Sequence, residues 1–199
     1  MNQKLIATRD FRISFPSTKR AVARVVFLSL LLASAPDWTS LTANATAREW
    51  KPGLSNNQWS NPNNWDPAGI PQNGDALVFN GNGLISPDGM MVNDLVSLTV
   101  SSLTFGTQNA GGEVDWNLSG NTLIVSQGIY LANDNGTDVY IHCGLILAQN
   151  VAFSVSFYST EDLHVTGPID LNGHTLSLTP ESDTSVELSG VVSGVTRAR

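Results

Sequence analysis

Short runs in which every second residue is apolar fill the chain after residue 47, and they restrict the folds that it can adopt. Alternation with a period of two places one face of a strand in a core and the other in solvent. Gly, Asn, Asp, Ser and Thr interrupt the runs every few residues, which breaks helices and makes turns. We therefore predict an all-β protein. The clearest runs are defined by Val139, Ile141, Cys143, Leu145 and Leu147, by Phe153, Val155 and Phe157, and by the pairs Leu163/Val165, Ile169/Leu171, Leu176/Leu178 and Val186/Leu188.

Most of these runs hold only two or three inward residues, and they recur about every 6 to 12 residues. The strands of a β-sandwich are longer, whereas a β-solenoid is made of short strands joined by polar corners. We predict a right-handed parallel β-helix after an N-terminal signal segment, and we keep a β-sandwich as the alternative. Its core is expected to include Leu145, Val155, Val165, Leu176 and Leu188.

An internal repeat supports the solenoid. Residues 118–125 read LSGNTLIV and residues 171–178 read LNGHTLSL, so Leu, Gly, Thr and Leu are identical in register at an offset of 53 residues. This offset corresponds to two rungs of about 26 residues or three of about 18, and either length suits one turn of a β-helix.

The N-terminal region has the pattern of a secretory signal. Residues 25–33 form an apolar stretch that follows Lys19, Arg20 and Arg24, and small residues come after it. Nine residues make about 14 Å of helix, roughly half of a bilayer core, so we expect no stable membrane span. We predict a protein that is exported and either secreted or held at the cell surface.

The cleavage position has two candidates. One follows Ala33-Ser34-Ala35 and the other follows Ala45-Thr46-Ala47. Pro36 comes directly after the first candidate and disfavours processing there, so we assign residues 1–47 to the signal region, with cleavage after Ala47.

The segment after this signal is rich in Trp, Asn and Pro. It reads WSNPNNW over residues 59–65, continues with Gly-Ile-Pro and Gly-Asp, and ends in the apolar strand 77–79. This opening resembles that of exported bacterial proteins built from autotransporter-associated β-strand repeats, and residues 169–178 and 186–194 resemble the body of those repeats. The resemblance implies a parallel β-helix exported to the cell surface, and it implies no catalytic residues.

These patterns divide the chain into four parts. Residues 1–47 are the signal region, 48–80 an N-terminal cap, 81–195 the solenoid rungs and 196–199 a short tail. In the family that the chain resembles, further rungs follow a Ser-Gly-x-x-Ser-Gly stretch such as residues 189–194. We therefore expect the chain to be an N-terminal piece of a longer repeat protein, and its uncovered last rung to favour self-association.

The charge of the body excludes several function classes. From Pro52 to Thr196 there is no Lys or Arg, while 14 acidic residues lie between Asp66 and Glu187, so this part has a net charge of −14. Such a surface repels phosphate, which excludes nucleic-acid binding. The absence of basic residues also argues against a polysaccharide lyase, in which a base commonly acts on a uronate.

Cys143 is the only cysteine, so we predict no internal disulfide. We expect Cys143 itself to be a small buried residue of the core.

Trp50, Trp59 and Trp65 have two interpretations. Exposed indole rings stack on sugars, which would make the cluster a carbohydrate site. A solenoid also needs a cap over its first rung, and the cluster lies where that cap is expected. We favour the cap and keep sugar stacking as the alternative.

A second candidate site is a turn rich in oxygen ligands, with Asp134, Asn135 and Asp138. Carboxylate and amide oxygens bind calcium, but the spacing is not that of an EF-hand loop. A tight turn is the preferred interpretation, and calcium is the only cofactor that we consider.

Other chemistry finds little support. Glu113 and Asp115 are two residues apart and could share a face, as a pair of glycosidase carboxylates would, but solvated charge is the simpler interpretation. The alternation directs His142 and His164 outward and puts His174 in a turn, so no zinc site is predicted. We assign no catalytic residue.

Two function hypotheses follow. The first is an exported, non-enzymatic β-helix of structural or adhesin-like type, with surface glycans or a second copy as partner. The second is a carbohydrate-binding module that uses the Trp cluster, or a β-helix carbohydrate-active enzyme that uses Glu113 and Asp115.

Overall fold

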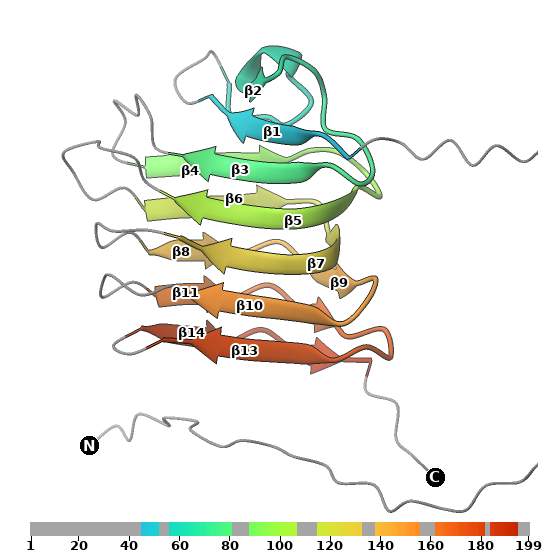
Figure 1. Cartoon of the computed structure of the whole chain (residues 1–199), viewed down its shortest axis with the longest axis vertical. Helices are drawn as coiled ribbons and strands as arrows, with labels where there is room; N and C mark the ends of the chain where they lie inside the picture. Colours follow the sequence, from blue (N-terminus) through green and yellow to red (C-terminus); the bar gives the residue numbers. More distant parts are fainter. Residues whose placement is uncertain are drawn as a thin grey trace, which may run out of the picture. The chain divides into compact units, whose positions relative to one another are not determined.

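A computed structural model of the chain describes residues 45–51, 56–80, 88–106, 115–132, 138–155, 162–181 and 184–194. Almost every regular element in these ranges is a strand, and none is an α-helix. The strands pair in parallel and lie above one another in successive layers (Figure 1). Short alternating runs therefore become the rungs of a β-solenoid, as predicted, and the parallel pairing rules out the β-sandwich alternative.

The strands belong to three stacks, each of which contributes one strand to a rung. The first stack contains β1 (Ala47–Trp50), β3 (Ala76–Asn80), the second halves of β5 (Thr99–Gly106) and β7 (Leu123–Leu131), β10 (Val151–Val155) and β13 (Leu176–Pro180). The second contains β4 (Asp88–Asn93), β6 (Asp115–Gly120), β8 (Val139–Ile141), β11 (Asp162–Val165) and β14 (Ser185–Leu188). The third contains the first halves of β5 and β7, β9 (Leu145–Leu147), β12 (Ile169–Asp170) and β15 (Val192–Ser193).

The register gives the rung length directly. One inward column of the first stack passes through five rungs at intervals of 24 to 26 residues, and it consists of Leu77, Leu103, Ile129, Phe153 and Leu178. A column of the second stack has intervals of 23 to 27 residues and consists of Met91, Leu118, Ile141, Val165 and Leu188.

The internal repeat does not mark equivalent positions. Of the two rung lengths suggested by its offset, about 26 residues lies within the observed range and about 18 is wrong. Leu118 is aligned through Ile141 with Val165 in the second stack, whereas Leu171 follows β12 in the third stack. The two segments lie at different corners of the solenoid. They share a glycine with positive φ, Gly120 at 103° and Gly173 at 78°, so the similarity reports a common turn chemistry. A Cβ on Gly120 would also collide with the carbonyl group of Asn93.

Side chains on the inner faces form one continuous apolar core. Leu145, Val155 and Val165 are buried, as expected, and so is Cys143. Leu176 and Leu188 are only half-buried, because they belong to the last rung and pack against the core from one side. The expectation of full burial is therefore wrong for these two residues.

The Trp-rich segment covers the other end of the core. β2 (Trp65–Asp66) pairs antiparallel with β1, and a 3-10 turn, η1 (Pro62–Asn64), precedes it (Figure 1). Beside them, the backbone N–H of Trp59 donates to the Val92 carbonyl oxygen at 3.1 Å, and the Val92 N–H donates to Asn57 at 2.8 Å. The covering layer thus reaches both β1, which pairs with β3 of the first rung, and β4. The structure draws the boundary of this cap differently from the sequence, since β3 within residues 48–80 is itself a rung strand.

Candidate functional site

The three tryptophans of the first candidate site are interior residues. Trp59 and Trp65 are 0% exposed and Trp50 is buried as well. Their rings pack edge to face, with centroids 5.0 Å apart for Trp50 and Trp65 and 5.6 Å apart for Trp59 and Trp65. Sugar stacking needs a free ring face, so this alternative is wrong for the folded protein. The rings instead extend an aromatic core that continues through Phe79, whose ring stacks on Phe105 at 4.9 Å.

Two buried polar centres hold the cap together. The Asn64 side-chain amide donates to the carbonyl oxygens of Asn56 and Gln58 at 2.8 and 2.9 Å. Asp75, which is buried, accepts hydrogen bonds from the Arg48 guanidinium and from the backbone N–H of Gln72 at 2.9 Å. Sequence reasoning missed both centres, because the pairing of Arg48 with Asp75 spans 27 residues and no local pattern marks it.

Asp94 ties the cap to the corner between β4 and β5. Its carboxylate accepts a hydrogen bond from the Ser60 hydroxyl and another from the Ser60 backbone N–H at 2.9 Å. Burial acts to raise the pKa of Asp94, but these hydrogen bonds to the charged form outweigh it and hold the pKa below its ordinary value. The ionised carboxylate is thus part of the fastening of the cap.

Only part of the calcium candidate can be placed. Asp134 and Asn135 lie outside the described residues, as does Glu113 of the carboxylate pair. The Asp138 carboxylate accepts hydrogen bonds from the Asp162 backbone N–H at 3.0 Å and from the Tyr140 hydroxyl at 3.3 Å. Within the described ranges, no three His, Cys, Asp or Glu side chains gather as metal ligands.

Asp138 is part of an outward surface that we call the ladder face, formed by outward residues of β6, β8, β11 and β14. Its first row consists of aspartates at the beginnings of the strands. Asp115 accepts from the Asp138 backbone N–H at 3.4 Å, and Asp162 accepts from the Ser185 hydroxyl at 2.6 Å. Each carboxylate in this row accepts a hydrogen bond from a residue of the next rung, so the row links consecutive rungs.

The second row of the ladder face is partly aromatic. The register aligns Asn117, Tyr140, His164 and Glu187 in consecutive rungs. The rings of Tyr140 and His164 stack at 4.7 Å with an interplanar angle of 7°. Nδ1 of His164 lies 3.1 Å from a Glu187 carboxylate oxygen. The rings therefore face one another along the solenoid and present their edges to solvent.

A third element of the ladder face is His142, one of the two histidines expected to point outward. Its Nδ1 lies 2.8 Å from the Thr166 hydroxyl and its Nε2 lies 3.4 Å from the Asn117 amide oxygen. Both expected outward orientations are thus observed, while Cys143 next to it points into the core.

The electrostatics of the ladder face are dominated by its carboxylates. The pKa of Tyr140 is raised, first by burial of the phenol and then by the charges of Asp138 and Asp115 and the hydrogen bond to Asp138. Removal of the phenol proton would place another negative charge among these acids. The surface offers hydrogen-bond acceptors and ring edges, which suit the recognition of hydroxyl groups or cations better than that of anions.

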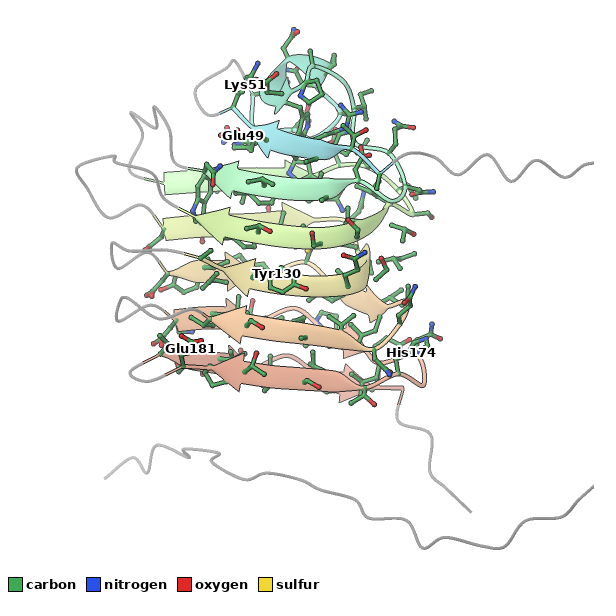
Figure 2. All side chains as sticks on the ribbon, viewed as in Figure 1. Glu49, Lys51, Tyr130, His174 and Glu181 are labelled. Atoms are coloured by element: carbon green, nitrogen blue, oxygen red, sulfur yellow. The ribbon has the colours of Figure 1, made fainter. Side chains whose placement is uncertain are left out.

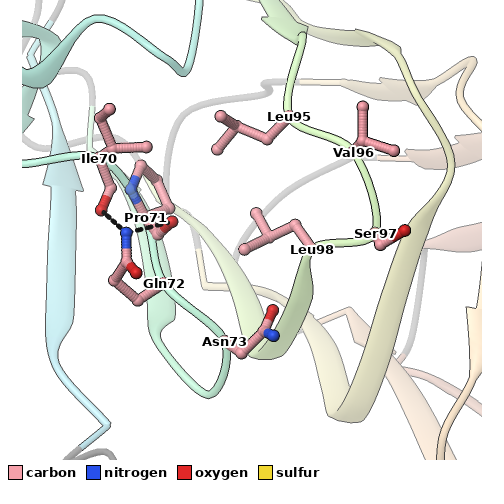
Figure 3. A pocket seen from close by; sticks show the side chains of 8 residues that line it. All are labelled: Ile70, Pro71, Gln72, Asn73, Leu95, Val96, Ser97 and Leu98. Carbon is pink, nitrogen blue, oxygen red and sulfur yellow. Dashed lines mark hydrogen bonds between the residues drawn. The ribbon is translucent and has the colours of Figure 1, made fainter.

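A concave region lies at a corner near the cap. It is an open hollow of about 510 Å³ between residues 70–73 and residues 95–98 (Figure 3). Its wall combines apolar side chains with the polar Gln72, Asn73 and Ser97, and the Gln72 amide donates to the carbonyl oxygens of Ile70 and Pro71 at 2.9 and 3.2 Å. None of its lining residues is ionisable, so acid–base chemistry has no group to use there.

No helix within the described part of the chain is long and apolar enough to span a bilayer. Comparison of this chain with protein-family models, curated proteins and solved structures gives no match.

Proposed function

We propose that this chain is an exported β-solenoid with a non-enzymatic structural or adhesin-like role, either secreted or held at the cell surface. The observation that carries the proposal is the ladder face, where each described ionisable or aromatic side chain is bonded to or stacked on a neighbour in an adjacent rung. Side chains used in this way stabilise a scaffold. The proposal includes the kinship with autotransporter-associated β-strand repeats that the sequence resembles.

The chemistry of the described residues supports a non-enzymatic role. Burial raises the pKa of Cys143 to about 12, which makes its thiol a poor nucleophile. The carboxylates of Asp115 and Asp138 accept hydrogen bonds from neighbouring rungs, and a general acid would have to donate one.

A second candidate function is the recognition of surface glycans by the ladder face. One observation favours it: Tyr140, His142 and Asn117 present ring edges and an amide beside three aspartates on one flat surface. Clustered acceptors of this kind hydrogen-bond sugar hydroxyl groups. This surface takes the place of the buried Trp cluster as the carbohydrate candidate.

A glycan array tests this second candidate with a matched pair of variants. Tyr140→Ala removes the central ring of the ladder face. Tyr130→Ala removes a tyrosine from the outward face of β7 in the first stack, where the phenol lies over Gly128 (Figure 2). Glycan binding that is lost in Tyr140→Ala and kept in Tyr130→Ala supports recognition by the ladder face. Absence of binding by the wild-type chain contradicts it and leaves the structural role.

Export and the absence of catalysis need separate tests. In a Gram-negative host, we expect the processed chain outside the cytoplasm, with an N-terminus near Arg48. Intact chain that begins at Met1 in the soluble cytoplasmic fraction contradicts export. Release of reducing ends from any of a panel of acidic and neutral polysaccharides by the purified chain contradicts the non-enzymatic role.

A further inference from the structure

The last rung of the solenoid has the shape of an interior rung but lacks a covering layer among the described residues. Leu178 in β13 and Val192 in β15 are each 42% exposed. Their register partners one rung earlier, Phe153 and Ile169, are buried. In these two inward columns, the side chains are thus buried in the fourth rung and partly exposed to solvent in the fifth.

The strand edges of this rung are open as well. Within the described residues, β13 pairs only with β10, β14 only with β11 and β15 only with β12. An open row of backbone donors and acceptors beside apolar side chains is a template for further strand pairing. Each interior rung of this molecule presents the same kind of surface to the rung that follows it, so the open surface continues an interface that the fold already uses.

The opposite end offers no such template. In the first stack, the free edge of β1 is taken by β2. In the second stack, Val92 of β4 exchanges backbone hydrogen bonds with Asn57 and Trp59. In the third stack, the Thr99 carbonyl oxygen accepts from the Gly74 N–H at 2.8 Å, and the Thr99 N–H donates to the Asn73 side chain at 2.9 Å. The first strand of each stack is thus bonded to a covering segment, and this cover stands in the way of head-to-tail stacking of two copies.

We propose that the open rung is an isologous interface at which two copies of this chain associate tail to tail. A two-fold axis perpendicular to the solenoid axis sets the terminal strands of the two copies against each other in antiparallel orientation. β13, the longest of the three, lies on this axis, so Leu178 of one copy faces Leu178 of its partner. Because the cap blocks the other end, the assembly closes as a dimer and cannot grow into a filament.

The strength of the dimer is limited by its size and its charge. Three short strands bury less surface than a standard interface, so association is weak and depends on concentration. Both copies have the same negative charge, and Glu187 and Glu181 of the last rung are exposed, so bringing two such rungs together is opposed by repulsion between the copies. Salt screens this repulsion, and the dimer is therefore favoured at high ionic strength.

Sedimentation equilibrium of the purified chain, from micromolar to millimolar concentration and at low and high salt, tests the proposal. We expect a monomer–dimer equilibrium that shifts toward dimer as salt is added. Leu178→Lys places two like charges across the axis and should weaken dimerisation at least about tenfold. Thr104→Lys, on the outward face of the first stack three rungs away, adds the same charge and should leave the dimer intact.

Disulfide trapping gives a second readout. Leu178→Cys should form a disulfide between two copies on mild oxidation, and Thr104→Cys should not. Cys143 is buried and gives no background in the folded chain. A thermal melt by circular dichroism establishes that each variant is folded. We expect substitutions of Leu178 to leave the fold intact, because this side chain is already partly exposed.

Three results would overturn the proposal. The first is a chain that stays monomeric at millimolar concentration and high salt. The second is open-ended growth beyond a dimer, which would require a contact at the sealed end. The third is a dimer that Leu178→Lys does not weaken or that Leu178→Cys does not trap. The proposal concerns the fold alone, so failure of export or of glycan binding leaves it standing.

Discussion

The two ends of this solenoid have the same strand arrangement but different coverage. At the N-terminal end, an antiparallel strand, stacked tryptophans and buried polar groups lie over the first rung. At the C-terminal end, Leu178 and Val192 are exposed, although their inward orientation matches that of buried residues one rung earlier. The comparison teaches that the burial of an inward side chain in a solenoid depends on whether another layer covers its rung. In one column, the side chain is buried at the N-terminal end and partly exposed at the C-terminal end.

The largest expected difference between the ends comes from a matched pair of leucines. Leu77 in the first rung is 0% exposed, and Leu178 occupies the same column in the last rung. Leu77→Asp buries an unpaired charge and should cost about 4 kcal/mol or more, enough to unfold a marginal domain. Leu178→Asp leaves the carboxylate in water and should cost less than about 1 kcal/mol. Equal losses of unfolding free energy in urea titrations would break the comparison.

A somewhat smaller effect is expected when the cap itself is opened. Trp65→Ala removes a fully buried ring that contacts both Trp50 and Phe79, and it should lower the unfolding free energy by about 3 to 5 kcal/mol. Val191→Ala trims a residue of the last rung that is 74% exposed and should change stability by less than about 0.5 kcal/mol. Chemical denaturation of both variants checks the contrast. A Trp65→Ala protein as stable as wild type would mean that the ring does not support the cap.

The beginning of the first strand should also matter, by about 1 to 2 kcal/mol. The Thr46 carbonyl oxygen accepts from the Ala76 N–H at 3.0 Å, and the Thr46 N–H donates to Asp75 at 3.0 Å. A chain that starts at Arg48 lacks both bonds, whereas one that starts at Ala45 keeps them. We expect the shorter chain to melt at lower temperature. Identical melting curves would show that the rung is complete without Thr46.

The smallest effect is an acid sensitivity confined to the cap. Because its folded-state pKa is lowered, Asp94 contributes stability above its unfolded pKa, and this contribution is lost as pH falls through the folded value. Asp94→Asn should therefore reduce the loss of stability below about pH 4. Glu181→Gln removes one carboxylate from the opposite end and is the matched control. Urea midpoints between neutral pH and pH 3 check both variants, and an unchanged slope in Asp94→Asn would contradict the role of this carboxylate.

Local alternation was enough to predict much of the fold. The parallel solenoid, the inward position of Cys143 and the outward position of His142 and His164 all follow from a period of two and the length of the runs. The rung register did not follow, because Gly120 and Gly173 repeat the same turn chemistry at different corners. The repeat therefore suggested that residues 118–125 and 171–178 occupy equivalent positions in different rungs, whereas the strand pairing places them at different corners.

The candidate site depended on contacts between rungs, which the sequence does not display. Tyr140 and His164 meet only because they are one rung apart, and Arg48 meets Asp75 across the whole first turn. The Trp cluster was expected in a cap segment, but the burial of its rings depends on Phe79 and on the backbone of Val92, which no local pattern displays. Sequence spacing becomes informative about such sites only once the rung length is known.

Native-state hydrogen exchange, measured at a concentration too low for dimers, tests the contrast between the two ends most directly. The account predicts that the amides of β3, beneath the cap, exchange only through global unfolding. The amides of β14 and β15 should exchange about 100-fold faster, because their rung opens without disturbing the others. Equal protection at both ends, or slower exchange in β14 and β15 than in β3, would contradict a solenoid with one sealed and one open end.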